Sequence, residues 1–236
     1  MKFLFKNEVV DYDCYNNANK ETILFLHGWG GNKFSFLETI NLTKKHFNIL
    51  SVTMPTTNPT TSVWDMLDYV SLIENLLALH NIKEVNIICH SFGFRVAMLL
   101  NKKIIISKLI VTAGAGIKKE NIFLKTIKNN NKILINNKKF NYLFKKIASV
   151  DYLNLSQTNQ KTFKNIVNFN LKFATKFSCH ILLFWGIKDT DTKLWIAKHI
   201  KHNNNAKLIT TRSDHFAYIK ESSKFNHEVL KFLKTN

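Results

Sequence analysis

A serine stands where an apolar strand pattern gives way to a helical pattern, and such a serine can act as a nucleophile. Residues 85–89 predict a buried strand, Ser91 follows, and residues 94–100 predict a helix. On this kind of turn the hydroxyl points out of the sheet, and small residues two positions before and after it prevent a clash. Cys89 and Gly93 stand there. The pattern is that of a nucleophile elbow, although a serine can also simply cap the helix that follows it.

A serine hydroxyl alone is a poor nucleophile at neutral pH, so a serine in this position needs partners elsewhere in the chain. A histidine must take its proton, a carboxylate must orient that histidine, and N–H groups must bind the oxyanion of the tetrahedral intermediate. Removing one such donor costs about a hundredfold to a thousandfold in rate. The surrounding elements must bring these groups together.

Strand and helix patterns alternate along most of the chain. Strands are predicted at residues 3–5, 9–12, 22–26, 48–52, 85–89, 108–112, 180–185 and 207–209. Helices are predicted at residues 34–46, 63–80, 94–100, 194–200 and 216–233. Such alternation predicts βαβ units and a parallel sheet, with Ser91 near its centre. The pattern lapses at residues 117–178, which are rich in lysine and asparagine. We therefore expect an α/β core of residues 1–116 and 179–236, with a small helical cap inserted at 117–178.

Four motifs of this chain resemble the α/β-hydrolase superfamily. They are His27-Gly28-Trp29-Gly30-Gly31, His90-Ser91-Phe92-Gly93, Gly186-Ile187-Lys188-Asp189 and Asp214-His215-Phe216-Ala217-Tyr218. Their order, serine before acid before histidine, is the order of that fold and differs from other serine hydrolases. The resemblance covers nearly the whole chain. It implies an α/β-hydrolase fold, with a mostly parallel central sheet flanked by helices.

The resemblance also assigns catalytic roles. It makes Ser91 the nucleophile, His215 the general base and Asp189 the acid that orients the histidine. Asp191 and Asp214 lie close by in sequence, and spacing alone does not exclude Asp191. A glycine three positions earlier favours Asp189.

By the same resemblance, the backbone N–H groups of Trp29 and Phe92 form the oxyanion hole, and both residues contact the substrate. The glycine-rich loop around Trp29 could alternatively bind phosphate. A phosphate loop needs a Lys-Ser or Lys-Thr pair after its glycines, and Asn32-Lys33-Phe34 does not provide one.

Two residues depart from the superfamily pattern. Cys89 replaces the first glycine of the elbow, and Phe94 stands where many relatives have another glycine. We expect Cys89 to be tolerated because it is small, and to be inert because it ends a buried strand. Phe94 is expected to alter the packing of the helix after Ser91.

The chain is strongly basic. Its 236 residues include 34 Lys and Arg against 16 Asp and Glu, a formal net charge of +18. Arg95 and Arg212 are the only arginines, and the lysines are spread among asparagines without any nucleic-acid motif. We interpret this as a solvated basic surface, rank nucleic acid last as a partner, and keep an acidic protein or an anionic substrate open.

Several classes of protein are excluded or disfavoured. No apolar run reaches the roughly 18 residues of a membrane span, and the N-terminus turns polar too early for a signal peptide. Cys14, Cys89 and Cys179 show no paired spacing. We therefore expect a cytoplasmic protein with reduced thiols, no metal and no cofactor.

The predicted function is hydrolysis of a small carboxylic ester through an acyl-enzyme. Three alternatives stay open. The first is a C–C bond hydrolase of the meta-cleavage type. The second is a hydrolase of esters carried by an acidic acyl carrier protein, which the basic charge mildly favours. The third is a non-catalytic binding module on the same fold.

Overall fold

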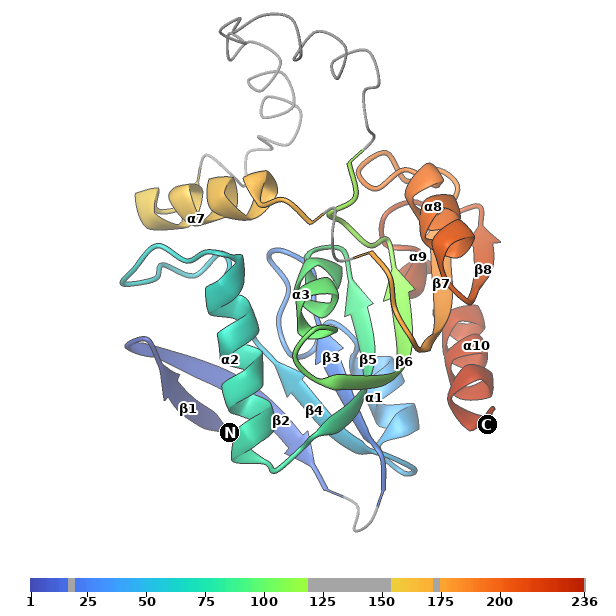
Figure 1. The fold of residues 1–236 in the computed structure, drawn as a ribbon, viewed down its shortest axis with the longest axis horizontal. Helices are drawn as coiled ribbons and strands as arrows, with labels where there is room; N and C mark the ends of the chain where they lie inside the picture. Colours follow the sequence, from blue (N-terminus) through green and yellow to red (C-terminus); the bar gives the residue numbers. More distant parts are fainter. Residues whose placement is uncertain (17–19, 119–153, 172–174, 236) are drawn as a thin grey trace, which may run out of the picture.

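The computed structural model describes residues 1–16, 20–118, 154–171 and 175–235. An eight-stranded sheet runs through the molecule in the order β1-β2-β4-β3-β5-β6-β7-β8 (Figure 1). The β1–β2 and β2–β4 pairs are antiparallel, and the pairs from β4 onward are parallel. The strand that leads to Ser91 is β5, in the middle of the parallel part. The predicted mostly parallel sheet is confirmed.

The elements follow the predicted alternation. The strands are β1 (Lys2–Phe5), β2 (Glu8–Tyr15), β3 (Thr22–Leu26), β4 (Asn48–Val52), β5 (Glu84–His90), β6 (Ile105–Thr112), β7 (His180–Gly186) and β8 (Ala206–Thr211). The helices are α1 (Leu37–Thr43), α2 (Met66–Leu79), α3 (Phe92–Leu100), α7 (Gln157–Asn168), α8 (Trp195–Asn203), α9 (Ala217–Lys220) and α10 (Ser222–Lys234). None of these described helices is long and apolar enough to cross a lipid bilayer.

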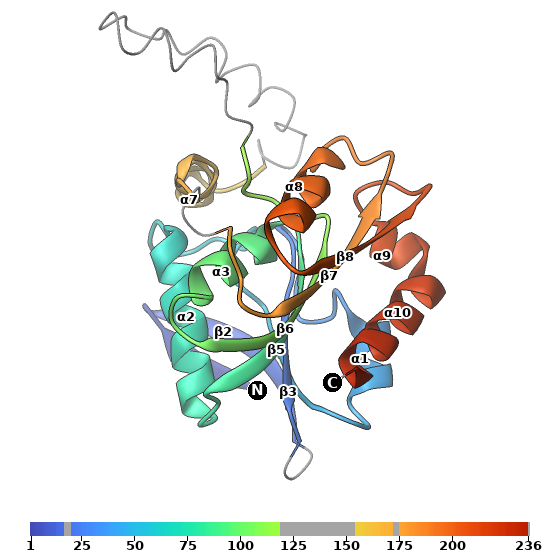
Figure 2. The same cartoon turned by 45° about the vertical axis from the view of Figure 1, so that its right-hand side comes forward.

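Helices cover both faces of the sheet (Figure 2). Helices α2, α3 and α8 pack on one face, and α1, α9 and α10 pack on the other. Strand β3 shows why: all five of its residues are buried, and successive side chains enter opposite clusters. Leu24 and Leu26 join the first cluster, whereas Ile23 and Phe25 join the second.

Two predicted helices have different bounds. The helix predicted at 34–46 begins only at Leu37, because the Asn32 side chain accepts the Phe34 N–H and holds a turn before it. The helix predicted at 216–233 is divided into α9 and α10 at Glu221, whose backbone (φ −120°, ψ 39°) leaves the helical region. Local hydrogen bonds and backbone geometry thus override the apolar periodicity at these two places.

Much of the predicted cap, residues 119–153 and 172–174, lies outside the described residues. In its described part, α7 lies above the carboxyl ends of the strands, near α2 and α3 (Figure 1). Asn159 of α7 is buried, and its amide donates to the carbonyl oxygens of Thr56 and Asn58 at 2.8 and 2.7 Å. The Thr162 hydroxyl accepts the Trp64 N–H at 2.9 Å. These contacts fix α7 on the segment between β4 and α2, and a separate cap unit stays a prediction.

Candidate active site

Ser91 has the strained backbone expected of an elbow. It lies between the end of β5 and the start of α3 with a φ of 46° and a ψ of −106°. Its N–H donates to the Thr112 carbonyl at 3.1 Å, and its carbonyl accepts the Ala115 N–H at 3.0 Å. A non-glycine residue in such a conformation costs on the order of 1–3 kcal/mol, so the surrounding structure must hold it. The last residue of β6 and the segment that follows it do so.

The Ser91 hydroxyl does not cap α3. Its side chain makes no cap hydrogen bond, and none of the described residues is hydrogen-bonded to it. The hydroxyl is therefore available for another role, which removes the main structural explanation for a serine at this position.

The residues around the elbow allow close packing. A Cβ added to Gly93 would lie 2.2 Å from the Leu26 carbonyl oxygen, so only glycine fits where α3 crosses the end of β3. Cys89 is fully buried, and burial raises the pKa of its thiol well above the ordinary value. Because the thiolate is the reactive form, Cys89 is a packing group, as its position predicted.

Phe94 is accommodated by a glycine elsewhere in the chain. Its ring is fully buried and stacks on Phe177 with a centroid distance of 6.0 Å. A Cβ added to Gly114, just after β6, would lie 2.7 Å from the Phe94 ring and 2.6 Å from Val111. The Phe94 ring, at a position where many relatives have glycine, thus occupies space that the absence of a side chain at Gly114 leaves free.

Gly114→Ala is therefore expected to destabilise the protein by about 1–3 kcal/mol, the usual cost of overpacking a dense core. Urea unfolding measures the change. In the background of Phe94→Ala the same substitution should cost less, because the contact with the ring is gone and only the contact with Val111 remains. Equal costs in both backgrounds would show that the Phe94 ring is not what requires glycine at position 114.

His215 and Asp189 form a hydrogen-bonded pair. His215 Nδ1 donates to Asp189 Oδ2 at 3.0 Å, and the two side chains are 14% and 0% exposed. His215 follows β8 and Asp189 follows β7, so parallel strands deliver both to one edge of the sheet. The contact leaves Nε2 of His215 free of Asp189, which is the arrangement that a general base requires.

Donors surround the Asp189 carboxylate on both oxygens. Oδ1 accepts the N–H groups of Asp191 and Thr192 at 2.9 and 2.8 Å, and Oδ2 lies 2.7 Å from the Thr192 hydroxyl. Burial alone would raise the pKa of Asp189, but the hydrogen bonds from His215 and Thr192 outweigh it, and the pKa is lowered. Asp189 is therefore ionised at neutral pH. Thr192 belongs to none of the four motifs, so the sequence does not predict its role.

The two alternative carboxylates lie differently. Asp191 is exposed and contributes its backbone N–H to Asp189. The Asp214 carboxylate pairs with Lys220 at 2.5 Å and accepts the Phe216 N–H at 3.1 Å. Neither carboxylate is hydrogen-bonded to His215, so the geometry favours Asp189 as the orienting acid.

Asp189, Asp191 and His215 could also be considered as metal ligands, since one ligand atom of each lies within 4.8 Å of the others. The hydrogen bonds argue against a metal site. Three N–H donors already bind the Asp189 carboxylate, the Thr192 hydroxyl lies 2.7 Å from Oδ2, and Nδ1 of His215 carries the proton that it donates. A metal ion would have to displace this whole network.

Two further histidines, His27 and His90, connect the loops around the candidate site. His27 Nδ1 donates to the Gly28 carbonyl at 2.6 Å, and its Nε2 accepts the Met54 N–H at 2.8 Å. His90 Nε2 donates to the His215 carbonyl at 3.2 Å. A Cβ added to Gly28 would lie 2.5 Å from His90 Nδ1, so glycine is required there. Together these contacts tie the glycine-rich loop and the His215 loop to the end of β5.

Both histidines are neutral at pH 7. Burial lowers the pKa of His27 to about 4, and burial together with the charge of His215 lowers that of His90 to about 3. In the unfolded chain each would titrate near its ordinary pKa of about 6.5. Between these limits the unfolded state binds more protons than the folded state.

The free energy of unfolding should therefore fall as the pH drops below about 6.5, by up to about 1.4 kcal/mol per pH unit for each histidine. Urea titrations at pH 7, 6 and 5 measure the free energy of unfolding and its slope against pH. In His27→Gln the slope between pH 6 and 5 should be smaller than in the unaltered protein. An identical slope would contradict a buried, neutral His27.

Trp29 and Phe92 lie side by side. Their rings meet edge to face with a centroid distance of 5.8 Å. Phe92 begins α3, so its N–H has no partner within the helix. None of the hydrogen bonds of the described residues uses the N–H of Trp29 or Phe92. Both predicted oxyanion donors are therefore available on neighbouring segments.

An aromatic cluster continues from these two residues. Phe163 of α7 packs on the Trp29 ring with a centroid distance of 5.1 Å. Tyr69 of α2 packs on the Phe92 ring with a centroid distance of 4.9 Å. The helix that covers the carboxyl edge thus adds an aromatic side chain to the candidate oxyanion loop.

His90, the residue before Ser91, connects His215 to the elbow. The centroids of the His90 and His215 rings lie 4.8 Å apart, and the His90 side chain is hydrogen-bonded to the His215 carbonyl. The structure therefore brings His215, Asp189 and the end of β5 together, while a direct hydrogen bond between Ser91 and His215 is absent among the described residues.

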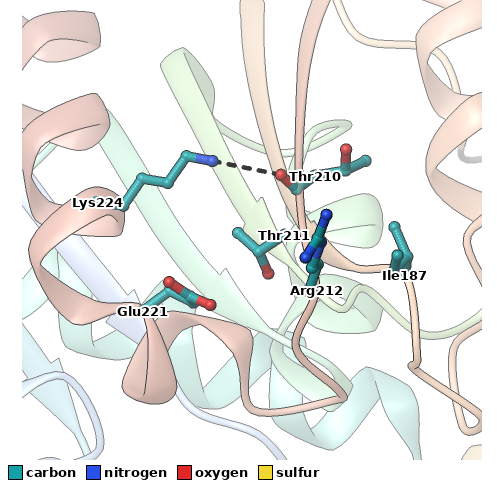
Figure 3. Close-up of a pocket in the computed structure, with 6 residues that line it drawn as sticks. All are labelled: Ile187, Thr210, Thr211, Arg212, Glu221 and Lys224. Atoms are coloured by element: carbon teal, nitrogen blue, oxygen red, sulfur yellow. Dashed lines mark hydrogen bonds between the residues drawn. The ribbon is translucent and has the colours of Figure 1, made fainter.

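A hollow of about 360 Å³ lies apart from these groups, where β7 and β8 end near α10 (Figure 3). It is lined by Ile187, Thr210, Thr211, Arg212, Glu221 and Lys224. Lys224 donates to the Thr210 carbonyl at 3.4 Å. Its charged groups belong to side chains at the surface, and it contains none of the candidate catalytic residues.

The chain is similar to a curated hydrolase and to many solved structures. No protein family model matches the chain. The uncharacterized hydrolase YugF of Bacillus subtilis is 23% identical over 113 residues, which cover 45% of this chain and 41% of that protein. The chain thus matches less than half the length of this curated relative.

Two solved structures cover nearly the whole chain. MGS-M2, an α/β-hydrolase enzyme from a deep-sea metagenome library of the Medee basin, superposes with a TM-score of 0.76 at 18% identity, over 100% of this chain and 98% of its own. The esterase EaEST from Exiguobacterium antarcticum gives a TM-score of 0.72 at 16% identity, over 96% of each chain. The chain therefore has the α/β-hydrolase fold that its motifs resemble.

Proposed function

We propose that this protein is a serine hydrolase that cleaves carboxylic esters through an acyl-enzyme formed on Ser91. One observation carries the proposal. The His215–Asp189 hydrogen bond lies at the sheet edge where the strained Ser91 presents an uncommitted hydroxyl. A nucleophile, a base and an acid in these places are what acyl transfer requires.

In the proposed first step, the Ser91 oxygen attacks the ester carbonyl carbon while its proton passes to His215 Nε2. The carbonyl oxygen becomes an oxyanion, which the N–H groups of Trp29 and Phe92 stabilise. Asp189 stabilises the imidazolium that has formed. His215 then returns the proton to the departing alkoxide, the C–O bond breaks, and the acyl group remains on Ser91.

Water completes the proposed cycle. His215 takes a proton from a water molecule as its oxygen attacks the acyl carbon. The second tetrahedral intermediate collapses, the bond to Ser91 breaks, and the serine recovers its proton from His215. The products are an alcohol and a carboxylic acid.

Aromatic side chains support an ester with an apolar part. The rings of Trp29 and Phe163, both partly exposed, lie in contact next to the candidate oxyanion donors, and exposed aromatic rings contribute to binding mainly through the apolar area that a ligand buries. The similarity to EaEST, an esterase, points the same way.

Labelling by a fluorophosphonate tests the proposal. This probe forms a stable bond only with an activated serine, so we expect stoichiometric labelling and a modified peptide that contains Ser91 in mass spectrometry. As the labelled fraction of the protein rises, its hydrolysis of p-nitrophenyl butyrate should fall to the same extent. A protein that neither labels nor hydrolyses esters would support the non-catalytic alternative, and turnover of a vinylogous diketone but of no ester would support C–C bond hydrolysis.

A further inference from the structure

Thr192 lies between the His215–Asp189 pair and the segment that follows β6. It is 5% exposed and belongs to the turn after β7. Its hydroxyl oxygen lies 2.7 Å from Asp189 Oδ2, 3.0 Å from the Ala113 carbonyl oxygen and 3.4 Å from His215 Nδ1. One small side chain therefore contacts groups that follow three neighbouring strands, β6, β7 and β8.

Residues 112–115, at the end of β6, hold the backbone of Ser91. The Thr112 carbonyl accepts the Ser91 N–H at 3.1 Å, and the Ala115 N–H donates to the Ser91 carbonyl at 3.0 Å. Ala113 lies between these two contacts and has a φ of 48°, which is uncommon for residues other than glycine. The Thr192 hydroxyl thus connects the turn of the acid to the same short segment that holds the elbow.

The backbone of Thr192 is held as well. Its N–H donates to Asp189 Oδ1 at 2.8 Å, and its carbonyl accepts the indole N–H of Trp185 at 2.6 Å. Trp185 is on β7, and its side chain is fully buried in the core. All three polar groups of Thr192 therefore have hydrogen-bond partners, and the position of its hydroxyl is fixed from the core.

The Thr192 hydroxyl has one proton and two acceptors within reach, the Asp189 carboxylate and the Ala113 carbonyl. Hydrogen bonds to an ionised group are about twice as strong as those between neutral groups. A buried position strengthens them further, because water does not compete. Without the hydroxyl, His215 would be the remaining partner of Asp189 Oδ2 among the described residues.

We propose that Thr192 is a positioning residue, whose hydroxyl sets the distance between the His215–Asp189 pair and the elbow of Ser91. The inference rests on the proposed function and adds to it a group that acts through Asp189. Within the described part of the chain, no hydrogen bond joins Ser91 to His215 directly. Their alignment therefore depends on the segments that carry them, and a misplacement of about 1 Å can cost about a hundredfold in rate.

Two substitutions separate the hydroxyl of Thr192 from its shape. Thr192→Val keeps the branched shape and removes the hydroxyl, whereas Thr192→Ser keeps the hydroxyl and removes a methyl group. In Thr192→Val, kcat for p-nitrophenyl butyrate should fall by about ten- to a hundredfold, the usual effect of losing a hydrogen bond to a charged group. KM should hardly change, because the hydroxyl acts on the reacting groups and not on substrate binding. Thr192→Ser should keep kcat within severalfold of the unaltered protein.

Thr43→Val is the matched control. Thr43 is also fully buried, and its hydroxyl donates to the Thr39 carbonyl at 2.8 Å. It ends α1, just before the chain enters β4, and so lies toward the opposite edge of the sheet from the candidate catalytic residues. Thr43→Val loses a buried hydroxyl of the same kind and should leave kcat unchanged. Labelling by the fluorophosphonate should slow in Thr192→Val but not in Thr43→Val.

The two variants at position 192 give opposite results for a packing role. If Thr192→Ser loses as much kcat as Thr192→Val, or if Thr192→Val keeps full activity, the inference is wrong and the esterase proposal stands. If circular dichroism shows that Thr192→Val does not fold, Thr192→Ala and Thr192→Ser give the same comparison, because they differ by the hydroxyl alone. Absence of ester hydrolysis and of labelling in the unaltered protein would overturn the proposed function, and the inference with it.

Discussion

Ser91→Ala is expected to lower kcat for ester hydrolysis by about a millionfold, the loss seen when a serine nucleophile that works with a base is removed. The acyl-enzyme cannot form without the hydroxyl, and the oxyanion donors alone retain only a small rate advantage over water. Alanine keeps the Cβ of serine, so the strained φ of 46° is equally demanding in both proteins. The fold should therefore survive the substitution.

Hydrolysis of p-nitrophenyl butyrate and fluorophosphonate labelling measure the loss, and circular dichroism confirms the fold. Ser223→Ala is a suitable control, because Ser223 is exposed on α10. Labelling that persists in Ser91→Ala would place the nucleophile elsewhere.

Asp189→Asn is expected to lower kcat by about ten-thousandfold, the size of effect known for the wrong histidine tautomer. The backbone explains this expectation. The N–H groups of Asp191 and Thr192 bind Oδ1 and would hold the amide oxygen there. The new NH₂ group would then face His215 Nδ1 as a donor. His215 would have to accept at Nδ1 and carry its proton on Nε2, where it cannot take a proton from Ser91.

Asp191→Asn and Asp214→Asn are the matched controls for this change. Asp191 supports Asp189 through its backbone, which the substitution retains, and Asp214 is bound to Lys220. Both variants should keep kcat within severalfold of the unaltered protein. A loss in Asp191→Asn as large as that in Asp189→Asn would mean that the acid has been misassigned.

Much of this site could be predicted because its residues stand at the ends of strongly patterned strands. The apolar strand β5 and the glycine after Ser91 predict the elbow, and Asp189 and His215 follow β7 and β8 within short motifs. The order of motifs then predicts which strand ends meet. The glycine three positions before Asp189 favours it over Asp191 without excluding Asp191. The structural reason lies in the turn in which two backbone N–H groups point at one carboxylate.

Other features depend on contacts between distant segments and could not be predicted from local pattern. The fit of Phe94 requires Gly114, and the roles of His90 and Thr192 follow from bonds to His215 and Asp189. The burial of Arg95 likewise depends on α7, whose Ile166 carbonyl accepts its hydrogen bond. Such pairings require the sheet order and the docking of α7.

Helix α3 has a consequence for the dynamics of the whole molecule. All nine of its residues are buried, so it has no outward face and cannot open without breaking contacts with β3, β5 and α2. Its amide hydrogens should therefore exchange with solvent only through global unfolding, at the slowest rate in the protein. The turn that carries Ser91 is attached to the part of the molecule that fluctuates least. Motion at the candidate active site is therefore expected in the loops after β7 and β8, which carry Asp189 and His215, and not in the turn of Ser91.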